Sequence, residues 1–173
     1  MDINDFEKKI RNSYELNHVL VDWSVSCLIA DEIPGSIVGV PELSVLRKKL
    51  TLLKAPSDEV IANSVGQLFA ACAKRSGNSE ILLRVENAND RLNYIRICEA
   101  RMQTAPLEPL LKIVQYGSEG DYEMLRSSLN TQFELSLRML PHVMRQGIFP
   151  AVSMTDEVVV ESVAEKPNSS WRQ

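Results

Sequence analysis

The sequence has few of the residues that catalytic and metal sites use most. It contains two histidines and three cysteines, and no two cysteines form a CxxC pair. It also lacks the signatures of a serine nucleophile elbow, a phosphate-binding loop, a dinucleotide-binding turn, a zinc protease and a calcium loop. We therefore expect a protein that is not an enzyme, with no catalytic residue, no cofactor and no metal ion.

One histidine has an acidic neighbour at helical spacing. Glu15 and His18 form an ExxH pattern, which places both side chains on one helix face, as in di-iron helical bundles. A di-iron site needs a second pattern of this kind, and His142 has Met139 three positions before it. We expect His18 to face the solvent or to cap a helix rather than to bind a metal.

Two further absences concern the location of the protein. No apolar run approaches the roughly 18 residues of a membrane span, and the N-terminus carries acidic residues where a signal peptide needs a basic segment. Cys27, Cys72 and Cys98 lie in apolar stretches of helical pattern, where a free cysteine behaves as a small hydrophobic residue. These features favour a reducing compartment, the cytoplasm, and no membrane span.

The chain also lacks an excess of basic charge. It has 23 acidic and 19 basic residues, a formal charge of −4, which is the wrong sign for a protein that coats nucleic acid. Residues 34–56 differ, because they hold four basic residues and one acidic residue. This stretch predicts a solvated helix face or, as the alternative, phosphate contacts by Arg47, Lys48, Lys49 and Lys54.

The residues that are present predict a single all-α domain. With 45% apolar and 24% charged residues the composition is that of a globular protein, and the apolar residues recur at steps of three and four. We expect a single-domain bundle of five to six helices at residues 1–149 and an extended, partner-dependent tail at residues 150–173. The helices are expected at 5–31, 41–54, 57–77 and 79–104, then as a short helix that ends at Gly117 and a long one that Pro141 bends or ends.

Two of these helices carry expectations about which side chains face outward. In the first helix the apolar stripe places Trp23 in the core and leaves Val25 and Ile29 as exposed apolar residues. In the helix at 79–104 four arginines alternate with acidic residues, so we expect solvated ion pairs and contacts with neighbouring subunits. These are Arg84, Arg91, Arg96 and Arg101.

The tail carries the strongest expectation of a partner. DEVVVESV, with Val158 and Val160, is typical of an extended segment that adds a strand to another protein. SSWRQ, with Trp171 and Arg172, places a large aromatic side chain in a polar terminus, where it would serve as an interface anchor.

The leading hypothesis is thus a non-enzymatic helical-bundle subunit that acts through protein–protein association, with a protein partner or with itself, as a structural or adaptor component of a larger assembly. The alternative is a small nucleic-acid-associated subunit that uses the basic helix at 41–54 as a phosphate-backbone clamp.

Overall fold

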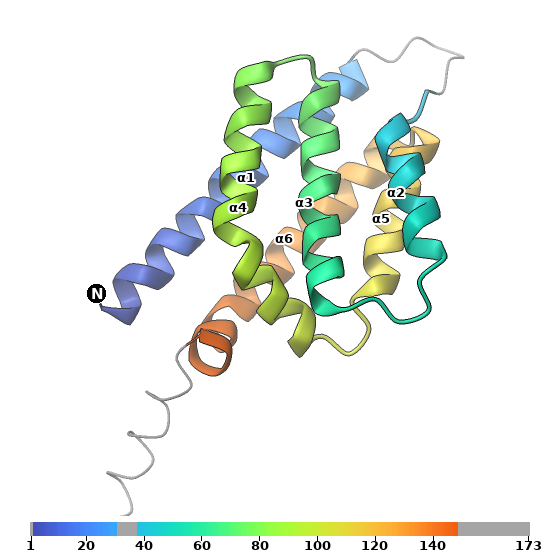
Figure 1. The fold of residues 1–173 in the computed structure, drawn as a ribbon. Coiled ribbons are helices and arrows are strands. Elements are labelled where there is room, and N and C mark those ends of the chain that lie inside the picture. Colours follow the sequence, from blue (N-terminus) through green and yellow to red (C-terminus); the bar gives the residue numbers. More distant parts are fainter. Residues whose placement is uncertain (1, 31–37, 149–173) are drawn as a thin grey trace, which may run out of the picture.

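A computed structural model describes residues 2–30 and 38–148 of the chain, and every regular element in these two ranges is helical. The predicted all-α fold is therefore confirmed (Figure 1). The α-helices are α1 (Ile3–Ala30), α2 (Pro41–Thr51), α3 (Asp58–Arg75), α4 (Ser79–Met102), α5 (Leu107–Glu119) and α6 (Tyr122–His142), and a π-helical turn, η1 (Val143–Ile148), follows α6.

Short polar side chains start three of these helices. Ser57 accepts a hydrogen bond from the Val60 amide at the start of α3. Asn78 does the same for two amides at the start of α4, and Asp121 for the Met124 amide at the start of α6. Each cap satisfies amides that have no partner within the helix, which fixes where the helix begins.

Two predicted helix ends were wrong. Helix α2 ends at Thr51 instead of Lys54, where the amides of Leu52 and Leu53 donate to the carbonyls of Lys48 and Leu50 and close its last turn. Helix α5 continues through Gly117 to Glu119, and Gly120, whose φ of 80° is left-handed, caps it. Gly117 serves packing instead, since a Cβ atom there would lie 2.3 Å from Cδ1 of Leu43, and its absence lets α2 approach α5 closely.

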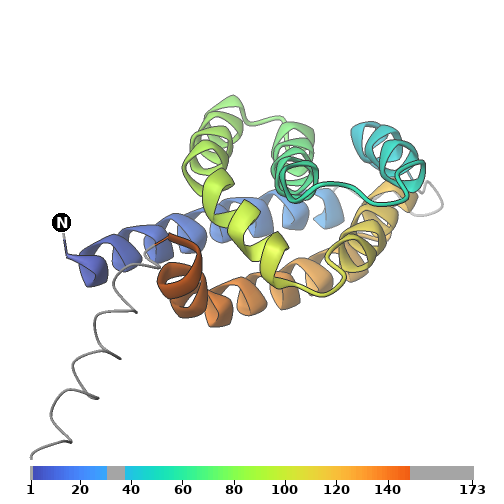
Figure 2. The ribbon, with the colours of Figure 1, turned by 60° about the horizontal axis from the view of Figure 1, so that its bottom comes forward.

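The helix that contains Pro141 behaves as the proline predicts. Helix α6 ends at His142, one residue after Pro141, and passes into the π-helical turn η1. Figure 2 shows η1 turning away from the line of α6. Val143 and Met144 of η1 are fully buried, so the change of direction brings the end of the described chain back onto the bundle.

The helices pack in two layers. The antiparallel helices α1 and α6 lie side by side beneath α3 and α4, and α2 packs against α5 at one end of the molecule (Figure 2). The described core forms two hydrophobic clusters. One includes Leu43, Leu68, Val114 and Leu125, and the other includes Ile10, Leu92, Leu140 and Met144.

None of the helices in the two described ranges is both long enough and apolar enough to cross a membrane.

Candidate functional site

The buried face of α1 is not the one that hydrophobicity alone predicts. Val25 is completely buried, and Trp23, which we expected in the core, is 45% exposed. The polar residues Asn17 and Ser24 are buried in its place. The reason is that α1 packs against α6, α4 and α3 together, so its neighbours determine the face that is covered, and polar side chains enter that face where they find partners.

As a result, the solvent-facing side of α1 is apolar as well. Leu16, Val19 and Trp23 are 46%, 62% and 45% exposed and follow one another at helical spacing. Half-buried Cys27 and exposed Ala30 extend the line toward the helix end. We call these five residues the outer stripe. An unpartnered apolar stripe along one helix is a typical protein contact surface.

Two acidic residues adjoin the outer stripe: Glu15 is exposed at its N-terminal edge, and Asp22, within its length, is already paired. Between Leu16 and Ala30 the sequence holds one ionised side chain, Asp22, and its carboxylate accepts two hydrogen bonds from Arg126 of α6, at 2.7 and 2.9 Å. The Arg126 guanidinium lowers the pKa of Asp22. A partner on the outer stripe therefore meets no uncompensated charge from this part of α1.

Inside the bundle, several polar side chains meet where the two hydrophobic clusters adjoin. Tyr14, Asn17, Arg96 and Glu99 are each at least 95% buried. Asn17 and Arg96 both donate to Oδ1 of Asn89, at 3.1 and 2.9 Å. We call these four residues, with Ser136 of α6, the polar cluster.

The remaining contacts of the polar cluster hold it in place from α3 and α6. The Arg96 guanidinium lies over the Phe69 ring, 5.0 Å from its centroid. The Ser136 hydroxyl donates to Oε2 of Glu99 at 3.4 Å. Arg96 and Glu99 do not form a direct ion pair with each other in the described structure, so a buried cation and a buried anion lie close without contact.

Burial changes the acid–base behaviour of these groups. Loss of hydration raises the pKa of Glu99, and a hydrogen bond from the Tyr14 hydroxyl and the positive charge of Arg96 act in the opposite direction. Burial, together with the negative charge of Glu99, raises the pKa of Tyr14 well above its ordinary range. Desolvated ionisable groups of opposite charge at one place are typical of functional sites, although structural networks show them too.

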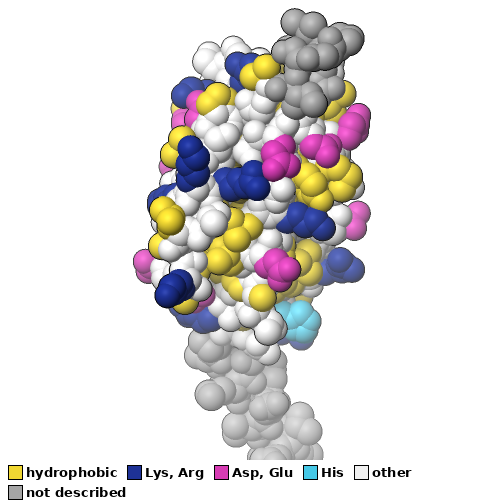
Figure 3. Space-filling view, turned by 90° about the vertical axis from the view of Figure 1, so that its right-hand side faces the viewer, with side chains coloured by type: hydrophobic (Ala, Val, Ile, Leu, Met, Phe, Trp, Pro, Cys, Tyr) yellow, Lys and Arg dark blue, Asp and Glu magenta, His cyan; other side chains and the backbone are white. Residues whose placement is uncertain are grey.

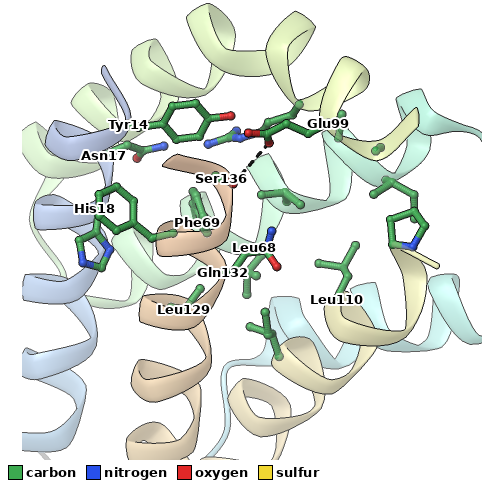
Figure 4. A pocket seen from close by; sticks show the side chains of 18 of the residues that line it. Tyr14, Asn17, His18, Leu68, Phe69, Glu99, Leu110, Leu129, Gln132 and Ser136 are labelled. Carbon is green, nitrogen blue, oxygen red and sulfur yellow. Dashed lines mark hydrogen bonds between the residues drawn. The ribbon is translucent and has the colours of Figure 1, made fainter. Parts of the chain in front are cut away.

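A cavity of about 60 Å³ adjoins the polar cluster. Figure 4 shows its two ends: Tyr14, Asn17, Glu99 and Ser136 lie together at one end, and Leu68, Leu110 and Leu129 lie at the other. Half-buried Gln132 stands between them. The cavity is thus polar at one end and apolar at the other, with walls from α1, α3, α4, α5 and α6.

The ExxH histidine is a structural residue. The His18 ring is half-buried and stacks on the Phe133 ring, with the centroids 4.0 Å apart and the planes 6° from parallel. The expectation of a solvent-facing or capping histidine was therefore wrong, because α6 covers this side of α1. No group of three or more metal-binding side chains occurs within residues 2–30 and 38–148.

The basic residues of α2 do not form a single positive surface. Arg47 is paired with Glu119 of α5 at 2.8 Å, whereas Lys48, Lys49 and Lys54 are exposed. Figure 3 views the side of the molecule where α2 and α5 lie, and its basic side chains are separated by hydrophobic, uncharged and acidic ones. Phosphate contacts at these residues stay a prediction.

The four arginines of α4 divide into two kinds. Arg84 pairs with Glu80 in the same helix and Arg101 with Asp58 of α3, both with exposed side chains, and Arg91 is exposed as well. Solvated pairing was wrong for Arg96, which is 4% exposed.

The residues of the tail that we predicted to bind a partner, Val158, Val160, Trp171 and Arg172, lie outside the described residues.

The cysteines are free thiols in two environments. Cys72 and Cys98 are buried, as predicted, and burial raises the pKa of Cys72 to about 12. Cys27 is half-buried on the outer stripe. Cys72 is therefore protonated and unreactive near neutral pH, and Cys27 is the more accessible thiol of the three.

The sequence analysis did not predict the polar cluster, although the pattern of α4 indicates part of it. Arg96 and Glu99 stand among apolar residues of α4, at positions whose helical neighbours are Leu92, Ile95 and Cys98. Charged residues at the same helical positions as an apolar stripe point toward the core. The helical spacing alone indicates this direction for Arg96 and Glu99.

Comparison of this chain with models of known protein families, with curated proteins and with solved structures finds no match.

Proposed function

We propose that this chain is a non-enzymatic helical-bundle subunit that acts through protein–protein association. Its contact surface is the outer stripe of α1, and its partner is a second copy of the chain. The observation that carries the proposal is the exposure of Leu16, Val19 and Trp23 in a line that holds no unpaired charge from Leu16 to Ala30. Removing such a stripe from water is favourable by about 25 cal/mol for each Å² of apolar surface.

The order of the side chains along the stripe favours a second copy over another protein. An antiparallel α1 pair related by a two-fold axis at Trp23 places Leu16 opposite Ala30 of the other copy, and Val19 opposite Cys27. Each larger side chain then faces a smaller one, which permits close packing. Two-fold pairing is also the commonest symmetry of protein oligomers.

The length of the stripe sets the strength of the contact. From Leu16 to Ala30 the helix rises by about 21 Å, so an interface made by α1 alone falls at the small end of specific interfaces. We therefore expect a reversible dimer whose population depends on protein concentration.

Replacing Trp23 with aspartate should abolish the dimer. The substitution puts two negative charges face to face at the two-fold axis and removes the large aromatic side chain, whose truncation at an interface centre typically costs about 2 kcal/mol, or thirtyfold in affinity. Light scattering across a concentration series measures the mass. The matched control is Val45→Asp, at a position of α2 that is 68% exposed; it should dimerise like the unaltered chain. A monomer at every concentration for the unaltered chain would refute the proposal.

A cross-link tests the register itself. In the proposed pairing Val19→Cys faces Cys27 of the other copy, and mild oxidation should give a disulfide-linked dimer on a non-reducing gel. Within one chain the same two positions are about 12 Å apart along the helix, too far for a disulfide. The control Val19→Cys with Cys27→Ser should run as a single chain on the same gel, because it lacks the second thiol. Equal cross-linking by the two variants would contradict the antiparallel register.

A further inference from the structure

Four polar atoms of the polar cluster make no hydrogen bond of standard geometry in the described structure. They are Oη of Tyr14, Oδ1 of Asn17, Nη2 of Arg96 and Oε1 of Glu99, and all four residues line the cavity. Tyr14 and Glu99 interact with each other through a looser hydrogen bond, so Oδ1 of Asn17 and Nη2 of Arg96 are the two atoms that most need a partner. Buried polar atoms in proteins are almost always paired with protein groups or with ordered water. Unpaired polar atoms that line a cavity therefore indicate an occupant that hydrogen-bonds to them.

The hydrogen-bonding capacity of these atoms determines which groups the occupant must have. Arg96 offers a donor, Asn17 and Glu99 offer acceptors, and the Tyr14 hydroxyl is able to do either. The occupant must accept from Arg96 and donate to a carboxylate or amide oxygen at the same end. Arg96 and Glu99 already neutralise each other, so an uncharged occupant leaves the buried site neutral and a charged one does not.

The opposite wall of the cavity adds a second requirement. Leu68, Leu110 and Leu129 face the polar end (Figure 4), and they favour an aliphatic body over a second polar group. The volume of about 60 Å³ holds roughly four water molecules, which corresponds to a molecule of about four to six non-hydrogen atoms.

We propose that this cavity is a binding site for a small uncharged amphipathic molecule with a hydrogen-bond donor and acceptor at one end and a compact aliphatic group at the other. A primary carboxamide is the simplest group that meets the requirement. Its carbonyl oxygen accepts from Arg96, its amino group donates to Asn17 and to the Tyr14–Glu99 pair, and its alkyl group packs on the three leucines. This site is separate from the outer stripe, and it does not depend on dimer formation.

Two isomeric probes test the proposal on the full chain. Isobutyramide and N,N-dimethylacetamide have the same atoms, but the second has no N–H group. In a titration followed by amide and side-chain NMR shifts, isobutyramide should saturate shifts at Asn17 and Arg96 with a dissociation constant on the order of millimolar, as expected for so few atoms. It should bind at least about tenfold tighter than its isomer, since the latter offers no donor to Asn17 or to the Tyr14–Glu99 pair.

A conservative substitution of Tyr14 tests the hydrogen bonding further. Tyr14→Phe removes the hydroxyl of the Tyr14–Glu99 pair, which the amino group of the probe contacts, and keeps the ring, so it should fold normally and weaken isobutyramide binding several-fold. Equal affinity for the two isomers would overturn the proposed hydrogen bonding. Absence of saturable shifts at Asn17 and Arg96 up to tens of millimolar isobutyramide would mean that the cavity holds water only, and it would overturn the site.

Discussion

Replacing Gly39 with alanine should destabilise the fold by more than about 4 kcal/mol, a loss that few single substitutions reach. A Cβ atom at this position would lie 2.0 Å from the carbonyl oxygen of Ser118 and 2.5 Å from its carbonyl carbon. Both atoms belong to the backbone near the end of α5, so no side-chain rotation relieves the overlap. Residues 38–40 would have to move away from α5.

That movement breaks several other contacts. The Val40 amide donates to the Gly117 carbonyl at 2.9 Å, and the Tyr122 hydroxyl donates to the Val38 carbonyl. Val40 is completely buried in the larger hydrophobic cluster. A loss of this size is a large part of the roughly 5–15 kcal/mol that stabilises an ordinary domain, so the variant should be unfolded or close to it near 37 °C.

Gly66→Ala is the matched control. Gly66 lies inside α3, and a Cβ atom there would meet its nearest neighbours at 3.7 Å, an ordinary contact. Alanine is favoured over glycine in a helix by about 1 kcal/mol, so this variant should match or exceed the stability of the unaltered chain. Urea unfolding followed by circular dichroism measures both variants. Similar midpoints for the two would show that the 38–40 segment is not held against α5.

The contrast between these glycines shows where sequence reasoning succeeds. Helix existence followed from apolar spacing and caps, because those are local properties; Ser57 and Asn78 start α3 and α4 at their predicted positions within one or two residues. The close approaches at Gly39 and Gly117 join residues about 75 positions apart in the chain. Nothing in a local pattern separates such a glycine from one like Gly66.

The outward faces were harder to predict for the same reason. In α1 both sides are apolar enough to be a core face, and Trp23, the largest side chain, suggests the wrong one. The choice depends on the directions from which α3, α4 and α6 approach, and that information lies in the tertiary packing. Asn17 could be buried because Asn89, 72 residues further along the chain, supplies its partner.

Arg96→Met should destabilise the protein by about 1–3 kcal/mol at neutral pH, the usual cost of leaving buried polar groups without a partner, because Arg96 and Glu99 lie close to each other but form no direct ion pair in the described structure. Methionine fills a similar volume, so the loss is mainly electrostatic. The Glu99 carboxylate would remain 4% exposed without the cation that now stabilises it. The hydrogen bond to Asn89 and the contact with the Phe69 ring disappear as well. Arg96→Met combined with Glu99→Gln should recover a substantial part of the loss, because no unpaired charge then remains.

The pH dependence identifies Glu99 as the source of the loss. Burial raises the folded-state pKa of Glu99 above its unfolded value near 4.5, and Arg96 holds that rise in check. Without Arg96 the folded-state pKa rises further, so protonation favours the folded form and the penalty develops as the pH increases above about 4.5. Urea unfolding near pH 5 and near pH 7.5 should therefore show a smaller loss for Arg96→Met at the lower pH. In the double variant the loss should not grow as the pH rises, since the glutamine that replaces Glu99 does not titrate. A pH-independent loss in the single variant would mean that Arg96 acts through packing on Phe69 and Asn89, and that the charge of Glu99 is stabilised by other groups.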